Sequence, residues 1–366
     1  MGFIYVGLET SPASVVKIDK SVMTAAAAWV GGGSQEFVEA LATDNDYIYA
    51  GLDTIPAVVV KIDPETMLGV AGWTGGAGED ETWALYFDGT YIYAGLFTSP
   101  AKVIKINPVT MATVAVWNAA AADTQCLSLI HDGVYLYAGL NNTPARVSKI
   151  NPATMATVAN WDGGAGEDVS LSLATDGAYI YAGLSTSPAR VIKINPATMA
   201  TVAAWTGAAG QNGCHSLYFK GGQLYAGMEG LPAKVIKINP ATMATVAAWV
   251  GAAGQNGCHS LYFKGGQLYA GMEALPAKVI KIDPVTMATV AAWVGAAGET
   301  DLRDVSFAGS FIFVSLYLVP AKVIKIDPAT MATVAAWVGG AGQEYAVPLL
   351  EIGVVRIDHL PLMGVH

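Results

Sequence analysis

Charge is scarce in this sequence, and its balance is wrong for nucleic acid. Charged side chains make up 13% of the 366 residues, and 29 acidic residues against 19 basic ones give a net charge of −10. Nucleic-acid binding depends on lysines and arginines that neutralise phosphates. The composition therefore excludes a nucleic-acid partner.

Long apolar runs are missing as well. No run approaches the roughly 20 residues that span a bilayer. Met1-Gly2-Phe3 leads directly into the first repeat, without the basic and apolar regions of a signal peptide. We therefore expect no membrane insertion and, by default, a cytoplasmic location.

Cysteine is rare, and no catalytic motif is present. The three cysteines, Cys126, Cys214 and Cys258, occupy equivalent repeat positions without a CxxC pair, which predicts small buried apolar side chains. His215 and His259 each follow a cysteine, but neighbours in a strand face opposite sides, so they do not form a nucleophile and base. Neither a Ser-His-Asp arrangement nor HExxH occurs. An enzyme is therefore uncertain and disfavoured.

What the sequence does contain is one 44-residue unit written eight times. Its proline recurs at Pro12, Pro56, Pro100, Pro144, Pro188, Pro232, Pro276 and Pro320. Its tryptophan recurs at Trp29, Trp73, Trp117, Trp161, Trp205, Trp249, Trp293 and Trp337. A fixed period in this range indicates a repeat architecture. Copies 205–248 and 249–292 differ at four positions, which indicates a recent duplication.

One repeat is predicted to form four strands. In the copy that begins at Trp205, a glycine-rich loop precedes a short strand at His215–Phe219, and a Gly-Gly turn leads into an aromatic second strand. Val235–Ile238 is the third strand. The alanine-rich Thr242–Trp249 could be a helix, because Asn-Pro precedes it and glycine follows it. It has no charged face, however, and this favours an outer strand.

Four antiparallel strands repeated eight times predict an all-β, eight-bladed β-propeller over residues 1–350. The chain begins inside a blade, with Phe3–Leu8 as its second strand, and Tyr345–Leu350 stands where the missing first strand belongs. We expect the two termini to pair and close the ring. Residues 351–366 are then a strap over the seam or a strand offered to a neighbouring subunit for self-association.

The repeat resembles the YVTN-type and quinoprotein-like propeller repeats. The likeness rests on Tyr49-Ala50-Gly51, Val60-Lys61-Ile62-Asp63 and Thr66, and their equivalents cover about 350 residues. It implies an aromatic strand, an aliphatic strand and an Asp-x-x-Thr turn in each blade. It also implies one route to an enzyme, a quinoprotein-type dehydrogenase with its site over the central channel. The chain departs from that pattern, with Met67 in place of the turn glycine and no adjacent cysteine pair.

Two residue series are predicted to hold the blades together. The third-strand lysines should run their stems between blades and pair with a carboxylate or a carbonyl. They are Lys17, Lys61, Lys105, Lys149, Lys193, Lys237, Lys281 and Lys325. The tryptophans are expected to pack between blades, the alternative being platforms for sugar stacking.

A polar position follows each tryptophan by six residues. It holds Gln35, Glu79, Asp123, Glu167, Gln211, Gln255, Glu299 and Gln343. The loop that enters the first strand and the loop between the second and third strands lie on one face, the top face. One interpretation is a ring for a polar ligand or for calcium, held by Glu79, Asp123, Glu167 and Glu299, since Ca²⁺ takes oxygen ligands. The other is that these side chains cap backbone N–H groups. No other cofactor is predicted.

The loops before each proline vary most between copies. They include Phe97-Thr98-Ser99, Asn141-Asn142-Thr143 and Tyr317-Leu318-Val319. Binding surfaces are usually built from variable loops on a fixed scaffold. Phe97, Asn141, Asn142 and Tyr317 are therefore candidate binding residues beside the eight polar ones. The predicted function is a non-enzymatic binding or structural scaffold whose acidic top face takes a protein or glycan. The alternatives are the quinoprotein-like enzyme and a repetitive surface or virion-associated component.

Overall fold

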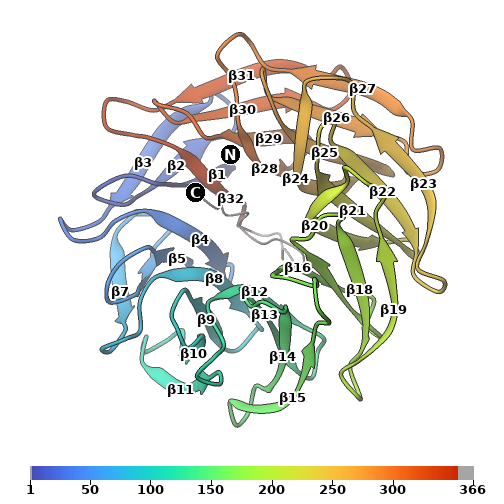
Figure 1. Ribbon diagram of the computed structural model, residues 1–366. Helices are drawn as coiled ribbons and strands as arrows, with labels where there is room; N and C mark the ends of the chain where they lie inside the picture. The colour runs from blue at the N-terminus through green and yellow to red at the C-terminus, as the bar shows by residue number, and fades with distance from the viewer. Residues whose placement is uncertain (1, 353–366) are drawn as a thin grey trace.

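The computed structural model describes residues 2–352, which form eight four-stranded antiparallel sheets arranged as blades around one axis (Figure 1). The predicted all-β, eight-bladed propeller is confirmed. Residues 2–352 form no helix of the length and apolar character that a membrane crossing requires.

Each blade places one strand in each of four concentric layers (Figure 1). The inner strands are β4 (Val38–Thr43), β8 (Thr82–Phe87), β12 (Cys126–His131), β16 (Ser170–Thr175), β20 (Asn212–Lys220), β24 (Gln255–Lys264), β28 (Leu302–Ala308) and β32 (Ala346–Leu350). The second strands are β1 (Phe3–Leu8), β5 (Ile48–Leu52), β9 (Ile92–Leu96), β13 (Leu136–Leu140), β17 (Ile180–Leu184), β21 (Gln223–Glu229), β25 (Gln267–Ala274) and β29 (Phe311–Leu316).

The two outer layers follow the same order. The third strands are β2 (Ser14–Asp19), β6 (Val58–Ile62), β10 (Lys102–Ile106), β14 (Arg146–Asn151), β18 (Arg190–Asn195), β22 (Lys234–Asn239), β26 (Lys278–Ile282) and β30 (Lys322–Asp327). The outer strands are β3 (Thr24–Val30), β7 (Gly69–Thr74), β11 (Thr113–Asn118), β15 (Ala156–Asp162), β19 (Ala200–Thr206), β23 (Ala244–Val250), β27 (Thr289–Val294) and β31 (Ala332–Val338). We number the blades from the one that contains β1.

The ring closes inside blade one. Its sheet runs β3-β2-β1-β32, so the last described strand pairs with the first, with Tyr5 opposite Leu350 and Val6 opposite Leu349. This pairing satisfies an edge that would otherwise be open. The strap predicted over residues 351–366 lies outside the described residues from 353 onward.

The alanine-rich segment is a strand, because nothing would bury the far side of a helix with its composition. In blade six β23 starts at Ala244, two residues later than predicted, and only Trp249 among its residues is buried. The preceding Met243 is still part of the turn, and its N–H donates to the Asn239 carbonyl at 2.8 Å.

That methionine occupies the turn position where the quinoprotein-like pattern has glycine. In all eight blades its φ lies between 52° and 55°, the left-handed region that favours glycine. The side chain is nonetheless buried, with 2–4% of its surface exposed. Apolar burial offsets the cost of the backbone conformation, about 1–2 kcal/mol.

The lysine and tryptophan series join neighbouring blades, as predicted. Each of the eight lysines donates its Nζ hydrogen to a backbone carbonyl of the next blade, at 2.6–2.8 Å. Lys325 reaches Lys20 and so carries the series across the closing seam. Six tryptophans donate their indole N–H to a threonine 40 residues later, at 2.8 Å. Trp29 and Trp337 lack this hydrogen bond, because the positions 40 residues onward around the ring hold Gly69 and Ala25, which have no hydroxyl.

The cysteines fill close approaches between neighbouring blades. Cys126, Cys214 and Cys258 are free and fully buried. A Cβ placed on Gly95 would lie 2.7 Å from the Cys126 sulfur, so a glycine in the neighbouring blade makes room for each thiol. Burial raises the pKa of Cys126 to about 12, which leaves the thiol protonated and unreactive. The predicted role as small buried residues is confirmed.

Candidate functional site on the top face

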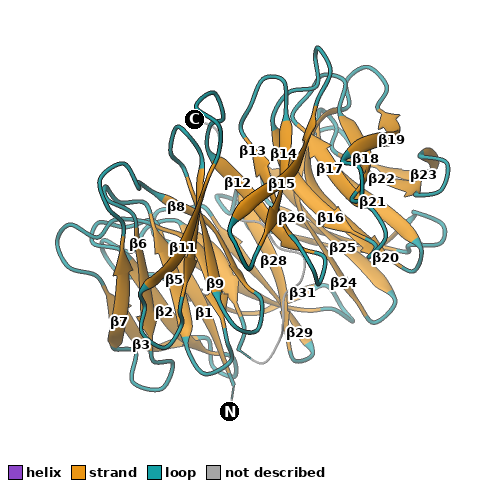
Figure 2. Ribbon diagram, turned by 90° about the horizontal axis from the view of Figure 1, so that it is seen from below, coloured by secondary structure: helices purple, strands orange, loops and turns teal. Residues whose placement is uncertain are grey.

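Two sets of loops meet on the top face, as the strand order requires. The loop that enters an inner strand bonds to the pre-proline loop of the preceding blade. The Ala101 N–H, for example, donates to the Asp123 carbonyl at 2.9 Å, and the Gln125 N–H donates to the Thr98 carbonyl at 2.8 Å. Figure 2 shows the strands running between two loop-covered faces of the ring. The top face is therefore tied together around the ring by backbone hydrogen bonds.

The eight polar residues that follow the tryptophans have one structural role in common. In every blade the side-chain oxygen accepts the backbone N–H of the residue three positions earlier, at 2.6–3.1 Å. Glu79 caps Gly76 in this way, and Gln35 caps Gly32. Capping therefore accounts for a carboxylate or an amide at this position in all eight blades.

The four carboxylates of this set also pair with cations. Glu79 lies 3.9 Å from Lys102, Asp123 2.6 Å from Arg146, Glu167 2.9 Å from Arg190 and Glu299 2.5 Å from Lys322. Each cation follows its acid by 23 residues in the sequence. At the matching position of the two blades served by Gln35 and Gln343 stand Val58 and Ser14, which carry no charge.

The calcium hypothesis finds no support in this arrangement. The four carboxylates stand on separate blades, and each already has its own cation. Within residues 2–352 no three His, Cys, Asp or Glu side chains come together as metal ligands. Calcium binding by Glu79, Asp123, Glu167 and Glu299 was one of two interpretations of the sequence, and the response of the melting temperature to calcium tests it.

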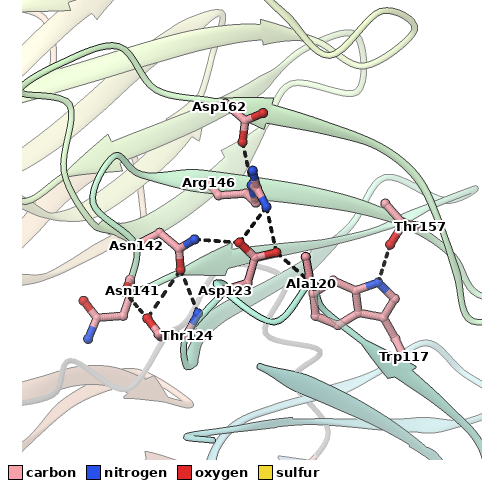
Figure 3. A network of polar contacts seen from close by, with 9 residues as sticks. All are labelled: Trp117, Ala120, Asp123, Thr124, Asn141, Asn142, Arg146, Thr157 and Asp162. Carbon is pink, nitrogen blue, oxygen red and sulfur yellow. Dashed lines mark hydrogen bonds and ion pairs between the residues drawn. The ribbon is translucent and has the colours of Figure 1, made fainter. Parts of the chain in front are cut away.

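Asp123 shows how a candidate binding residue can be fully engaged (Figure 3). Both of its oxygens accept from Arg146, at 2.6 and 2.7 Å, and one also accepts from the Asn142 side chain at 2.7 Å. The Asn142 oxygen in turn accepts the Thr124 N–H at 2.8 Å. Asn142 therefore holds its loop in place, and its removal would affect stability as well as any binding.

The other three pre-proline candidates contact side chains of inner-strand entry segments. Phe97 stacks on Trp83 with ring centroids 3.5 Å apart. Tyr317 stacks on Tyr345 at 4.1 Å. The Asn141 amide donates to the Gln125 side chain at 2.5 Å. The structure thus joins these residues to a set that the sequence analysis did not single out.

That set occupies two positions at the top of every inner strand. The first has a positive φ of 36–54° in all eight blades and holds Phe37, Glu81, Gln125, Val169, Gly213, Gly257, Asp301 and Tyr345. The second, two residues later, holds Glu39, Trp83, Leu127, Leu171, His215, His259, Arg303 and Val347. We call these sixteen residues, with the pre-proline residues that contact them, the top ring.

A β-bulge places the second position in the ring. In β4 the pairing passes from Val38–Leu52 to Ala40–Gly51, so Glu39 is an extra residue without a partner, and the same shift occurs in β8, β12, β16, β20, β24 and β28. Bulges re-aim a side chain and are frequent beside functional sites. The sequence offered a clue to this position, because its residue type differs between most neighbouring copies.

One half of the top ring contains basic side chains that are each paired with an acid. His215 Nε2 lies 3.0 Å from Glu229, and His259 Nε2 lies 2.8 Å from Glu273. The two imidazole centroids are 5.0 Å apart. Burial lowers the pKa of His259, while the hydrogen bond from each histidine lowers the pKa of its glutamate. In the following blade, blade eight, Arg303 lies 3.0 Å from Asp301.

The other half contains acids without such partners. Glu39 is only 8% exposed, and burial, followed by the charges of Glu9, Asp53 and Glu81, raises its pKa to about 8. Burial likewise raises the pKa values of Asp53 and Glu81. The top ring is therefore electrically asymmetric.

Comparison with known proteins supports the fold and leaves the family open. No family model and no curated protein matches the sequence. Among solved structures, the computationally designed Ika8 protein is similar at a TM-score of 0.68 and 14% identity, over 86% of this chain and 90% of its own. Dihydro-heme d1 dehydrogenase NirN, in complex with DHE, has a TM-score of 0.72 and 14% identity, over 96% and 75%. Sqt1 of Saccharomyces cerevisiae has a TM-score of 0.68 and 12% identity, over 84% and 86%.

Proposed function

We propose that this protein is a non-enzymatic binding scaffold that presents its top ring to a protein or glycan partner. One observation carries the proposal. The lysine, tryptophan and capping contacts repeat with little change, whereas the top ring changes chemistry from blade to blade. Residues with only a structural task would repeat like the rest of the unit, so the variation favours a task that differs around the ring.

Blades six and seven support the same view. They are the two nearly identical copies, and they place two equivalent His–Glu pairs side by side in the ring. A partner that contacts one pair can contact the second through the same chemistry. Duplication thus widens a binding surface without any new design.

The proposal includes kinship with YVTN-type and quinoprotein-like repeats. The Asp63 carboxylate accepts the N–H groups of Glu65 and Thr66 at 2.7 and 3.2 Å, as expected for an Asp-x-x-Thr turn. A scaffold is preferred over a quinoprotein-like enzyme because Met67 and its equivalents replace the turn glycine of that pattern and no two cysteines are adjacent in the sequence. Self-association through residues 351–366 and a repetitive surface component are compatible with the same scaffold.

The test compares the two faces. The top-face variants are Trp83→Ala, Leu171→Ala and Asn141→Ala. The control variants are Thr90→Ala and Val134→Ala, in exposed turns at the opposite end of the blades. A glycan array and affinity capture with mass spectrometry identify the partner, and calorimetry then gives its Kd for each variant.

We expect the top-face variants to weaken binding at least tenfold and the control variants to leave it unchanged. Melting curves separate lost contacts from lost stability. The proposal is wrong if the control variants abolish binding while the top-face variants are silent.

A further inference from the structure

Three acidic side chains of blades two and three form one continuous part of the top ring. Backbone hydrogen bonds set their order: the Asp53 N–H donates to the Phe37 carbonyl at 3.0 Å, and the Glu81 N–H donates to the Thr54 carbonyl at 2.9 Å. Glu39 follows Phe37 by two residues, on the bulge. We call Glu39, Asp53 and Glu81 the acidic sector.

The acidic sector differs from the four capping carboxylates and from the glutamates of blades six and seven in having no basic partner. Glu79, Asp123, Glu167 and Glu299 each face a lysine or an arginine, and the glutamates of blades six and seven face histidines. Within residues 2–352, none of the three side chains of the acidic sector forms an ion pair or a side-chain hydrogen bond. Glu39 is nevertheless more than nine-tenths buried. A buried carboxyl group without a partner is costly unless something else satisfies it.

Two uncharged polar groups near the acidic sector also lack hydrogen-bond partners. Thr54 is 7% exposed, and its hydroxyl has no hydrogen-bond partner. Its equivalents Thr10, Thr98 and Thr186 all donate to the carbonyl of the proline two residues later, at 2.8–3.0 Å. The buried indole N–H of Trp83 likewise has no acceptor. The acidic sector thus combines unmatched negative charge with two unmatched polar groups.

Aromatic surface adjoins the acids. Phe97, whose N–H donates to the Glu81 carbonyl at 2.9 Å, stacks on Trp83. Trp83 takes the position in blade three that Glu39 takes in blade two. The matching pair in blades six and seven, His215 and His259, has ring centroids 5.0 Å apart, so neighbours at this position are within side-chain reach. Carboxylates beside aromatic rings suit an organic cation, whose charge meets the acids while its alkyl stem lies on the rings.

We propose that the acidic sector binds an alkylammonium or guanidinium group. This inference rests on the proposed function and deepens it, because it assigns the partner a cationic group that enters the top ring at Glu39. A lysine or arginine side chain of a protein carries such a group, and so does a free amine. A bare metal ion is a poorer fit, since no three ligands converge in the described part of the chain.

Calorimetric titration with small probes tests the chemistry. The probes are Nα-acetyl-lysine N-methylamide, Nα-acetyl-arginine N-methylamide, butylamine and the neutral Nα-acetyl-norleucine N-methylamide, each at pH 6.5 and pH 9. We expect the cationic probes to bind and the norleucine probe not to bind. Binding should be at least tenfold tighter at pH 9 than at pH 6.5, because burial and the charges of Glu9, Asp53 and Glu81 raise the pKa of Glu39 to about 8, so its carboxyl group ionises between these two pH values. Tighter binding of the capped amino acids than of butylamine would indicate a protein side chain as the source, and the reverse a free amine.

Matched variants tie the result to the sector. Glu39→Gln should weaken cationic binding at least tenfold and remove most of its pH dependence, and Asp53→Asn should weaken it in the same direction. Glu299→Gln, which alters a carboxylate already paired with Lys322, should leave probe binding unchanged. Melting curves show whether each variant is folded.

The inference is overturned if no cationic probe binds at pH 9, if the neutral probe binds equally well, or if Glu39→Gln binds like the parent. Its failure is distinguishable from failure of the proposed function. Should the amines not bind while Trp83→Ala and Leu171→Ala still weaken an identified partner, the scaffold stands without the cation site.

Discussion

Glu39 should make the protein less stable as the pH rises. Its pKa in the folded protein is about 8, against 4.5 for an ordinary glutamate carboxyl. Because the folded state holds the proton more tightly, it binds more protons than the unfolded state between pH 4.5 and 8. Stability is therefore lost as the pH rises through this window and levels off above it. At about 1.36 kcal/mol per pH unit, the ionised carboxylate costs about 5 kcal/mol at pH 9 and under about 1 kcal/mol at pH 5.

The variant Glu39→Gln removes this cost and leaves a smaller one. An unpartnered buried amide costs about 1–3 kcal/mol at every pH. We therefore expect the variant to be slightly less stable than the parent at pH 5 and about 2–4 kcal/mol more stable at pH 9. The change of its relative stability across this range, about 4 kcal/mol, is the quantity to compare with the structure.

Urea unfolding at pH 5, 7 and 9, followed by tryptophan fluorescence, measures the effect for both proteins. Glu299→Gln serves as the control, because Glu299 pairs with Lys322 and its variant should gain no stability at pH 9. A relative stability of Glu39→Gln that stays constant from pH 5 to pH 9 would refute the burial argument. A loss of stability at pH 9 would show that the carboxylate has a cation in the folded protein.

Three further predictions concern the scaffold. Thr113→Ala removes the acceptor of the Trp73 indole and should lower the free energy of unfolding by about 1 kcal/mol. Ala25→Thr should supply the missing acceptor for Trp337 and raise the free energy of unfolding by up to about 1 kcal/mol. Urea unfolding measures both changes. Deleting residues 343–366 removes β32 and should lower the melting temperature and promote association through β1, so a truncated chain that melts like the parent and stays monomeric would contradict the closure model. Calcium should not raise the melting temperature, because the four capping carboxylates already have cations, and a concentration-dependent rise would revive the calcium hypothesis.

The scaffold could be predicted from sequence because its contacts repeat. Eight copies of Lys61 or Trp73 in the same context admit few roles, and joining neighbouring blades is a role that every copy can fill. The ring closure followed from counting, since blade one lacked a first strand and the C-terminal part supplied it. The conformation of Met67 was not foreseen, because a methionine with positive φ contradicts local preference and is tolerated only through burial in the packed ring.

The site was predicted only in part, for a geometric reason. The polar position at Glu79 drew attention by recurring in every blade, yet recurrence is the mark of a structural task, and the structure shows capping there. The more informative position, at Glu39, was hidden by the bulge. Simple alternation along β4 does not reveal that one extra side chain enters the top ring. The absence of basic partners around it is a property of two neighbouring blades together.

The uniform step between blades has a consequence for engineering. Each lysine from Lys17 to Lys281 donates a hydrogen bond to the carbonyl 47 residues onward, and Lys325 completes the circle at the Lys20 carbonyl, so the junctions are interchangeable to a first approximation. A blade is then a cassette: it can be moved around the circle, or the termini relocated to another pair of cassettes, while the junctions are preserved. The order of the top-ring residue types around the axis can then be changed by rearranging blades, for example by placing the acidic blade next to the two histidine blades.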